Sequence, residues 1–295
     1  MLNGIVCVDK PAGFTSFDVV AKLRGVFKTK KIGHAGTLDP MATGVLPVFV
    51  GKATKVIPYM DNKDKKYVAK FMLGKKTDTL DITGTILEEK ESNVTKEEVS
   101  EILKRYVGKI KQIPPMYSAV KKNGIPLYKL ARQGKVVERK SREVEIYELN
   151  CKNFDEKLQV GEIEVFCSSG TYIRTLCDDI GTELGVGGVL TDLTRTMACG
   201  YDLKECRTID EIISLKDNDM LEEAILPIES VFCSLPRVYL DSQQEKMFRN
   251  GVKLLLKDFS EINGQVAVYG RSFLGIAHLF EGKLKIDKLL AEDID

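Results

Sequence analysis

The sequence predicts an α+β fold, with a mixed, largely antiparallel sheet and a small β-rich domain at the C-terminal end. Strand-like apolar runs and helix-start signals are interspersed without a regular strand–helix–strand alternation. The composition, 43% apolar and 29% charged residues in a chain of 295, is that of a compact globular protein long enough for two domains. Between Pro227 and Pro236 the chain changes character, and Asn-Gly turns then separate short apolar runs.

The expected strands are short runs of apolar or alternating residues. The first two are continuously apolar, which is typical of strands covered on both faces. The last two alternate apolar and polar residues, which is typical of antiparallel strands with one exposed face. In chain order, the expected strands are 4–8, 45–50, 67–73, 144–149 and 162–166.

Helices are expected where a capping residue precedes apolar residues at helical spacing. Thr15 or Ser16 opens the first helix, in which apolar residues recur every three or four positions as far as Val26. Thr95 and Glu98 form a capping box for the second. The expected helices run from 15 or 16 to 26, from 95 to about 106, from 128 to 132 and from 171 to 184, the last ended by Gly185.

The net charge of +1 hides two basic blocks. Residues 1–76 carry a net charge of +9 and residues 104–142 carry +11, so the rest of the chain is acidic. Proline and glycine pairs in the second block indicate that much of it is loop. Concentrated basic blocks on a nearly neutral protein favour a surface that binds a polyanion, although charge alone also fits solvated lysines on unrelated faces.

Residue counts and motif spacing argue against several classes of site. Seven scattered cysteines without a CxxC pair do not fit a disulfide framework or a zinc ribbon, and His34 and His278 are too few for a histidine-rich metal site. Gly51-Lys52 fails as a phosphate-binding loop because Leu46 stands where a glycine is needed. No apolar run is long enough to cross a bilayer, and the start lacks the charge pattern of a signal peptide. We therefore expect a cytoplasmic protein with reduced thiols, no metal and no nucleotide cofactor.

Two segments concentrate residues suited to chemistry. The stretch 31–44 combines glycines, a histidine, Asp39 and Pro40, a rigid loop able to present the Asp39 carboxylate in a defined direction. A tight structural turn explains this pattern equally well. In the second segment, Tyr172 and Arg174 stand at a helix start, where the guanidinium either pairs with a carboxylate or phosphate or lies on the surface.

Read together, these segments resemble the bacterial tRNA pseudouridine-55 synthases, the TruB-type family. The resemblance covers roughly residues 3–230 and continues more weakly to 290. One region departs from the family pattern: Gly188-Val189 stands where Ala-His or Ala-Tyr is usual, and Cys199 stands where a glycine is usual, but Leu193 and Arg195 are kept. The matching motifs are Lys10-Pro-Ala-Gly-Phe-Thr-Ser, Gly33-His-Ala-Gly-Thr-Leu-Asp-Pro-Met-Ala-Thr-Gly-Val-Leu, Lys66-Tyr-Val-Ala, Thr77-Asp-Thr-Leu-Asp-Ile-Thr-Gly, Pro114-Pro-Met-Tyr-Ser-Ala-Val-Lys-Lys-Asn-Gly, Leu127-Tyr-Lys-Leu-Ala-Arg-Gln-Gly and Ser169-Gly-Thr-Tyr-Ile-Arg-Thr-Leu.

The resemblance implies an isomerase that converts uridine 55, in the T loop of tRNA, to pseudouridine. Such an enzyme flips the base out, breaks the bond between ribose C1′ and N1, and rejoins the base through C5. The implied layout is a catalytic domain of pseudouridine-synthase type at 1–230, with an RNA-gripping insertion at about 104–142, and a small RNA-binding-like β domain at 235–295. We expect tRNA as partner, no cofactor, no membrane, no obligatory protein partner and a monomer.

The resemblance also implies roles for individual residues. Asp39 matches the essential carboxylate, and three roles for it stay open: addition to the pyrimidine ring, attack on C1′, or initiation of sugar-proton loss. His34 would enter the space that the flipped base vacates, and Tyr67 would stack on that base. We expect Arg174 to pair with Asp39 and hold its pKa down. The substrate-binding residues implied are His34, Tyr67, Tyr172, Arg174, Leu193 and Lys10.

Two rival interpretations share this scaffold. A non-enzymatic RNA-binding protein would not need Asp39, Tyr67 and Arg174 together. A synthase subunit guided by an RNA–protein complex shares the aspartate motif, but the long basic insertion favours the stand-alone bacterial kind.

Overall fold

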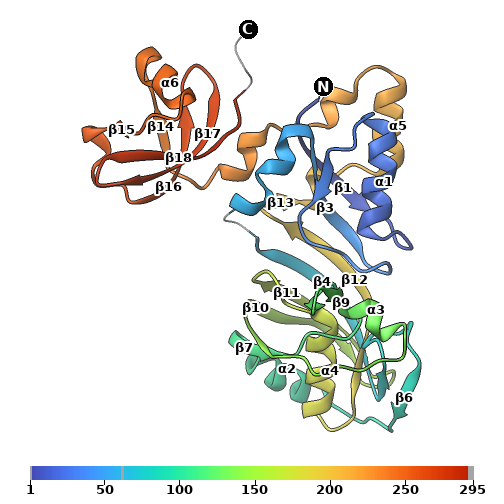
Figure 1. Cartoon of the computed structure of the whole chain (residues 1–295). Coiled ribbons are helices and arrows are strands. Elements are labelled where there is room, and N and C mark those ends of the chain that lie inside the picture. Colours follow the sequence, from blue (N-terminus) through green and yellow to red (C-terminus); the bar gives the residue numbers. More distant parts are fainter. Residues whose placement is uncertain (1, 61–62, 292–295) are drawn as a thin grey trace.

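The computed structural model describes residues 2–60 and 63–291, which fold around two main sheets (Figure 1). The larger sheet contains β1 (Gly4–Lys10), β2 (Ile32–His34), β3 (Thr43–Val50), β4 (Lys65–Leu73), β7 (Gly108–Gln112), β10 (Arg142–Asp155), β11 (Val160–Cys167), β12 (Gly188–Ala198) and β13 (Tyr201–Asp202). The smaller sheet contains β14 (Arg237–Tyr239), β15 (Leu254–Leu255), β16 (Gly264–Tyr269), β17 (Phe273–Phe280) and β18 (Lys283–Leu289).

Two hairpins and six α-helices complete the described fold, together with short 3-10 helices. The hairpins pair β5 (Lys75–Thr77) with β6 (Ile86–Glu89) and β8 (Lys121–Lys122) with β9 (Ile125–Pro126). The α-helices are α1 (Ser16–Val26), α2 (Lys96–Lys104), α3 (Leu127–Ala131), α4 (Ile173–Glu183), α5 (Ile209–Asp217) and α6 (Ser242–Arg249). The 3-10 helices are η1 (Gly51–Lys55), η2 (Ile57–Tyr59), η3 (Leu203–Glu205), η4 (Leu221–Ala224), η5 (Ile228–Phe232) and η6 (Lys257–Phe259).

The larger sheet runs in the order β1-β3-β12-β4-β11-β10-β7, with β2 beside β3 and β13 beside β12. All of these strand pairs are antiparallel except β3 with β12, which meet in parallel at only two residue pairs, Thr194–Thr43 and Arg195–Gly44. The predicted α+β class with a largely antiparallel sheet is confirmed. The sparse contact between β3 and β12 divides the sheet into two halves.

Alternation along β1 sends its side chains into two different cores. Val6 and Val8 join the core beneath α1 and α5. Ile5 and Cys7 point to the other face and join a core that includes Phe232 and residues of the smaller sheet. The smaller sheet also has a core of its own. It packs in addition against the half of the larger sheet that contains β1 and β3.

Most expected elements are present, with shifted ends. Thr15 caps α1 in a capping box with Asp18, and Thr95 caps α2 in a box with Glu98. The expected first strand continues to Lys10. The elements that were not predicted include β12, α5 and α6. The pattern of β12 is broken by polar residues that have partners in the sheet: Asp192 pairs with Lys70, and the Thr194 hydroxyl bonds that of Thr43.

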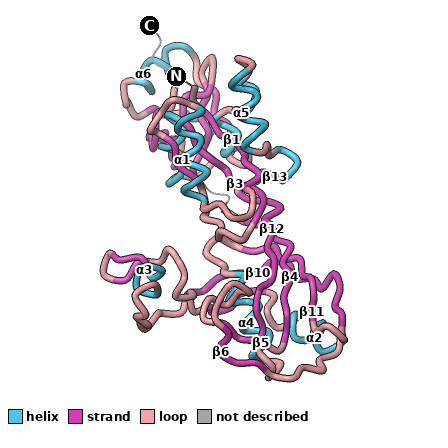
Figure 2. The backbone as a smooth tube through the Cα atoms, turned by 90° about the vertical axis from the view of Figure 1, so that its right-hand side faces the viewer, coloured by secondary structure: helices cyan, strands magenta, loops and turns pink. Residues whose placement is uncertain are grey.

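The segment between β7 and β10 forms an arm that projects from the body of the protein (Figure 2). It carries the hairpin β8–β9 and helix α3, and it lies within the basic block 104–142. Its base lies against the start of α4, where the Tyr117 carbonyl accepts a hydrogen bond from Arg174. The division of the chain into domains at 1–230 and 235–295 stays a prediction. In the described part of the chain, no helix is long and apolar enough to cross a membrane.

Candidate active site

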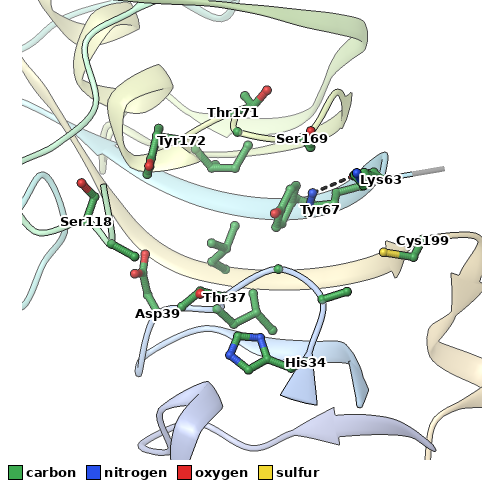
Figure 3. A pocket seen from close by; sticks show the side chains of 18 of the residues that line it. His34, Thr37, Asp39, Lys63, Tyr67, Ser118, Ser169, Thr171, Tyr172 and Cys199 are labelled. Carbon is green, nitrogen blue, oxygen red and sulfur yellow. Dashed lines mark hydrogen bonds between the residues drawn. The ribbon is translucent and has the colours of Figure 1, made fainter. Parts of the chain in front are cut away.

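A cavity of about 380 Å³ lies beside the point where β3 and β12 meet. Its walls come from the loop after β2, from β4 and β12, from the start of α4 and from the base of the arm. Figure 3 shows Asp39 and Ser118 at one end of this cavity, Lys63 and Cys199 at the other, and Tyr67 between them. The structure brings together six of the seven predicted site residues as lining: His34, Asp39, Tyr67, Tyr172, Arg174 and Leu193.

Asp39 and Arg174 form a two-point ion pair at one end of the cavity. The Nε of Arg174 lies 2.9 Å from Oδ2 of Asp39, and its Nη2 donates to Oδ1 at 3.1 Å. The arginine side chain is only 5% exposed, whereas 34% of the aspartate side chain remains exposed. The expected pairing is confirmed, and it fixes the orientation of a carboxylate that still faces the cavity.

A second carboxylate, Asp81, holds the far side of the same guanidinium. Its Oδ2 lies 3.6 Å from Nη1 of Arg174, and its side chain is 8% exposed. The Thr79 and Thr83 hydroxyls donate to Oδ1 of Asp81 at 2.8 and 2.6 Å. We had not predicted Asp81 as a site residue. The only signal for it was its place in the motif beginning at Thr77.

Two backbone carbonyls complete the surroundings of Arg174. Nη1 donates to the Thr79 carbonyl at 2.9 Å, and Nη2 donates to the Tyr117 carbonyl at 2.8 Å. The guanidinium therefore connects α4, the turn that carries Asp81, the Asp39 loop and the base of the arm. A planar fork of donors is suited to this many acceptors, and a single ammonium group is not.

The expected direction of the Asp39 pKa is wrong. Burial raises the pKa of this carboxyl above its usual value of 3.8, and the charge of Asp81 adds to the increase. Arg174 acts in the opposite direction, but its contribution is smaller than the cost of removing the carboxylate from water. The sequence indicated the partner correctly, but it did not indicate how much protein surrounds the pair.

The side chain of Arg195 anchors the loop that carries Asp39 through hydrogen bonds to backbone carbonyls. Its side chain is fully buried, and its Nε donates to the Val45 carbonyl at 2.7 Å while Nη2 donates to the Gly36 carbonyl at 3.1 Å. Gly44, at the start of β3, lies so close to β12 that an added Cβ would stand 2.2 Å from the Arg195 carbonyl oxygen. Arg195 thus restrains both ends of the loop.

Lys10 is a correction to the predicted set. Its side chain is fully buried, it does not line the cavity, and its Nζ donates to the carbonyls of Pro11, Phe14 and Pro40 at 2.8, 2.6 and 3.3 Å. Burial lowers the pKa of this ammonium group to about 8. Lys10 joins the first motif to the residue after Asp39, so its contacts are those of a positioning residue and not of the expected substrate contact.

The aromatic walls of the cavity have fixed positions. Tyr67 lies on β4 and is 6% exposed, and burial raises its pKa to about 12, so the phenol is neutral at neutral pH. The backbone of Tyr172 is held at both polar groups by the buried Gln112 amide, which accepts from the Tyr172 N–H at 2.9 Å and donates to its carbonyl at 3.3 Å. Gln112 was not predicted, because it lies 60 residues away in the chain.

His34 and Cys199 line other parts of the cavity. Burial, assisted by the charge of Arg195, lowers the pKa of His34 and favours the neutral imidazole. Cys199 has a φ of 57°, in the left-handed region that favours glycine, which fits the glycine that the family resemblance implies at this place. Its thiol faces the cavity (Figure 3). Within residues 2–60 and 63–291, no cluster of three or more His, Cys, Asp or Glu side chains could hold a metal ion.

The fold is shared with chains of two solved RNA–protein and protein complexes. The chain superposes with a TM-score of 0.75 and 24% identity on a chain of the structure titled "Crystal Structure of a Cbf5-Nop10-Gar1 Complex", covering 98% of this chain and 85% of that one. A second match, with a TM-score of 0.75 and 22% identity, covers 98% of this chain and 85% of a chain from an H/ACA RNP bound to a substrate RNA containing 2′-deoxyuridine. At these identities, the likeness shows the fold alone.

The chain belongs to the TruB family of pseudouridylate synthases. The model of the family's N-terminal domain matches residues 24–173, and two C-terminal models match 174–232 and 236–290. tRNA pseudouridine synthase B of Clostridium perfringens strain 13 is 41% identical over 299 aligned residues, which cover 99% of this chain and 100% of the relative. The enzymes of that name from Lactococcus lactis subsp. cremoris and Haemophilus influenzae are 44% and 38% identical, covering 88% and 93% of this chain and 81% and 89% of the relatives.

Proposed function

We propose that this chain isomerises uridine 55, in the T loop of tRNA, to pseudouridine, with Asp39 as its catalytic carboxylate. The observation that carries the proposal is the Asp39–Arg174 pair at the end of a cavity of about 380 Å³ with two tyrosines in its walls. Family membership and relatives named tRNA pseudouridine synthase B support the substrate and the reaction.

The reaction breaks the bond between C1′ and N1 and forms one between C1′ and C5, so it transfers no electrons and needs no energy donor. Asp39 acts in its ionised form in each of the three possible roles: addition to the ring, attack on C1′ or initiation of sugar-proton loss. Arg174 orients the carboxylate and keeps it negatively charged despite its burial. Asp81 and the carbonyls of Thr79 and Tyr117 hold the guanidinium in place.

The target base must leave its stack before it enters the cavity. Flipping costs a few kcal/mol, which contacts in the pocket offset. In the proposed complex, the uracil stacks on Tyr67, Tyr172 and Leu193 close the pocket around it, and His34 occupies the space left in the RNA loop. The neutral imidazole and the neutral phenol suit apolar stacking contacts better than charged groups would.

The arm supplies the basic surface for the RNA backbone. The block 104–142 carries a net charge of +11, and the base of the arm contributes Ser118 and Ala119 to the cavity wall. Lysines and arginines that contact phosphates displace bound counterions, so tRNA binding will weaken steeply as salt rises. We propose that the chain acts as a monomer without a protein partner, in the cytoplasm where tRNA is modified.

The decisive experiment uses the purified chain alone with an unmodified tRNA transcript, without added metal or cofactor. Chemical sequencing should map one pseudouridine to position 55 of the transcript. The matched controls are Asp39→Asn, which preserves shape and removes the charge, and a transcript with cytidine at position 55. Pseudouridine formed by Asp39→Asn at the wild-type rate would exclude the proposed catalytic residue, and a product at another uridine would exclude the proposed target.

A further inference from the structure

The charges around the catalytic cavity are divided unequally. Where Asp39 lies, Asp39 and Asp81 share the guanidinium of Arg174, so two carboxylates surround a single cation. Elsewhere in the site the balance is reversed, because two buried cations, Lys65 and Arg195, lie close together. A site with this polarity suits a substrate that carries negative charge away from Asp39.

Lys65 belongs to the catalytic cavity through its place on β4. It stands two residues before Tyr67, so the two side chains project from the same face of the strand, and both line the cavity. The Nζ of Lys65 donates to the Lys63 carbonyl at 2.7 Å. Figure 3 shows Lys63 at the end of the cavity away from Asp39, so the Lys65 ammonium group lies at that end.

The two cations approach each other at Gly36, in the loop that carries Asp39. A Cβ atom added to Gly36 would lie 4.0 Å from Nζ of Lys65, 3.1 Å from its Cε and 3.4 Å from Nη1 of Arg195. The φ of Gly36 is 81°, in the left-handed region that favours glycine. A larger residue would therefore be strained and would press on both cations, whereas glycine leaves them in place.

No carboxylate of the described residues forms an ion pair with Lys65 or Arg195. The acceptors of their hydrogen bonds are backbone carbonyls, those of Lys63, Val45 and Gly36 among them. Lys65 is 9% exposed and Arg195 is fully buried. Burying a cation without a negative partner is costly. The ammonium group has three donors, of which the contact with the Lys63 carbonyl uses one, so donors remain for a ligand in the cavity.

The surroundings of Lys65 disfavour its charged form. Burial, assisted by the charge of Arg195, lowers the pKa of this ammonium group. The thiols of Cys167 and Cys199 and the carboxylate of Asp64 act in the opposite direction, but their effect is smaller. Cys167 lies opposite Lys65 in the β4–β11 pair, and Asp64 precedes it in the chain. A negative partner in the cavity would relieve this cost.

The uracil ring acquires negative charge during the proposed reaction. When the bond between C1′ and N1 breaks, both electrons stay on N1, and the charge spreads to O2 and O4. Addition of a carboxylate to the ring likewise places charge on a ring oxygen. The ring becomes neutral again when C5 joins C1′ and loses its proton. A cation beside a ring carbonyl therefore stabilises the transition state more than the bound uridine.

A phosphate fits this position less well than the base does. It is charged before it binds, so it would have to lose much of its water to reach a side chain as buried as Lys65. A uracil carbonyl is uncharged when it enters. In addition, Tyr67, on which the uracil is proposed to stack, lies on the same face of β4 as Lys65.

We propose that Lys65 is a further catalytic residue, whose ammonium group donates a hydrogen bond to a carbonyl oxygen of the flipped uracil and stabilises the negative charge that the ring acquires. Lys65 keeps its proton throughout. Arg195 does not line the cavity and contributes through its charge alone. This inference rests on the proposed isomerisation of uridine.

Lys65→Met tests the proposal, because methionine has a similar length and no charge. Single-turnover pseudouridine formation at saturating tRNA should slow about 100-fold, as for loss of one preorganised donor. The Kd for tRNA and the slope of log Kd against log salt should not change. Lys66→Met is the matched control: Lys66 is the next residue on β4, is exposed on the other face and lies 5.0 Å from the centroid of the Phe166 ring. It should keep the wild-type rate.

Stability separates this role from a structural one. Because Lys65→Met removes an unpaired buried cation, its melting temperature should equal or exceed that of wild type. Lys65→Gln keeps a donor for the Lys63 carbonyl and should lose as much rate as Lys65→Met. A rate loss that appears only in Lys65→Met, together with a lower melting temperature, would show a structural role and overturn the proposal.

Two further results would contradict a contact with the uracil. A raised Kd with a smaller salt slope and an unchanged rate at saturation would assign Lys65 to a phosphate. A rate for Lys65→Met within three-fold of an active wild type would overturn this inference and leave the proposed function standing. If the wild-type chain forms no pseudouridine, the proposed function fails, and this inference fails with it.

Discussion

Replacement of Arg174 tests how the carboxylate is oriented. Arg174→Lys keeps one positive charge but removes the planar fork that spans two carboxylates and two carbonyls. Lysine can approach either Asp39 or Asp81 closely, but it cannot reproduce both contacts together with the hydrogen bonds to Thr79 and Tyr117. Arg174→Met, of similar length without charge, is the companion variant.

The magnitudes follow from burial. Arg174 and Asp81 are 5% and 8% exposed, so removing the cation leaves a buried carboxylate unpaired, which costs about 3–5 kcal/mol of unfolding free energy. Arg174→Lys should lose roughly half of that, because it keeps the charge and loses hydrogen bonds worth about 1.5–3 kcal/mol each. A misplaced carboxylate costs about 100-fold in rate, so we expect that loss in kcat for Arg174→Lys.

The assay combines single-turnover pseudouridine formation at several pH values with equilibrium unfolding in urea. Loss of the cation raises the Asp39 pKa further, so the acid limb of the rate profile should move to higher pH in Arg174→Met and less in Arg174→Lys. A rate for Arg174→Lys within three-fold of wild type, with an unmoved acid limb, would refute the reasoning.

Four further predictions concern the same site and the arm. Asp81→Asn should lower kcat about 10- to 100-fold with little change in KM, because Asp81 acts through Arg174; a proportional rise in KM would point to substrate contact instead. In the wild type, activity should fall as pH drops through the Asp39 pKa, and because burial raises that pKa the midpoint of the loss should lie above 3.8; a midpoint at or below 3.8 contradicts this. Gly44→Ala should destabilise the fold by about 3 kcal/mol, measured in urea, because φ is 98° and the new methyl group meets the Arg195 carbonyl; Gly170→Ala, also at positive φ but with open space around it, should cost less. Lys121→Gln should reduce the slope of log Kd against log salt by roughly one if the arm contacts phosphates, and an unchanged slope would place that contact elsewhere.

The sequence was sufficient to predict the cavity residues that lie in compact motifs. Asp39 and Arg174 could be paired in advance because each stands in a segment whose residue types suit one role, and the structure places them in contact across 135 residues of chain. The antiparallel sheet was also predictable, because the alternation of apolar and polar residues in β10 and β11 can be read from each segment by itself.

What could not be predicted depends on burial, which only the fold determines. Lys10 belonged to a matching motif, but its full burial and its contact with the Pro40 carbonyl, 30 residues away, are visible only in the fold. The direction of the Asp39 pKa could not be predicted either, because it depends on burial, and the cost of burial exceeds the effect of Arg174. Strand β12 was missed because Asp192, Thr194 and Arg195 interrupt its apolar pattern, and their partners on β4 and β3 are visible only in the fold.

Release of tritium from tRNA labelled at C5 of uridine tests the central claim most directly. Joining C1′ to C5 expels the hydrogen at C5, so each pseudouridine formed releases one tritium to water. Wild type should release one equivalent per tRNA, and Asp39→Asn should release none while binding tRNA with an unchanged Kd. Release by Asp39→Asn at the wild-type rate would contradict the assignment of Asp39 as the catalytic carboxylate.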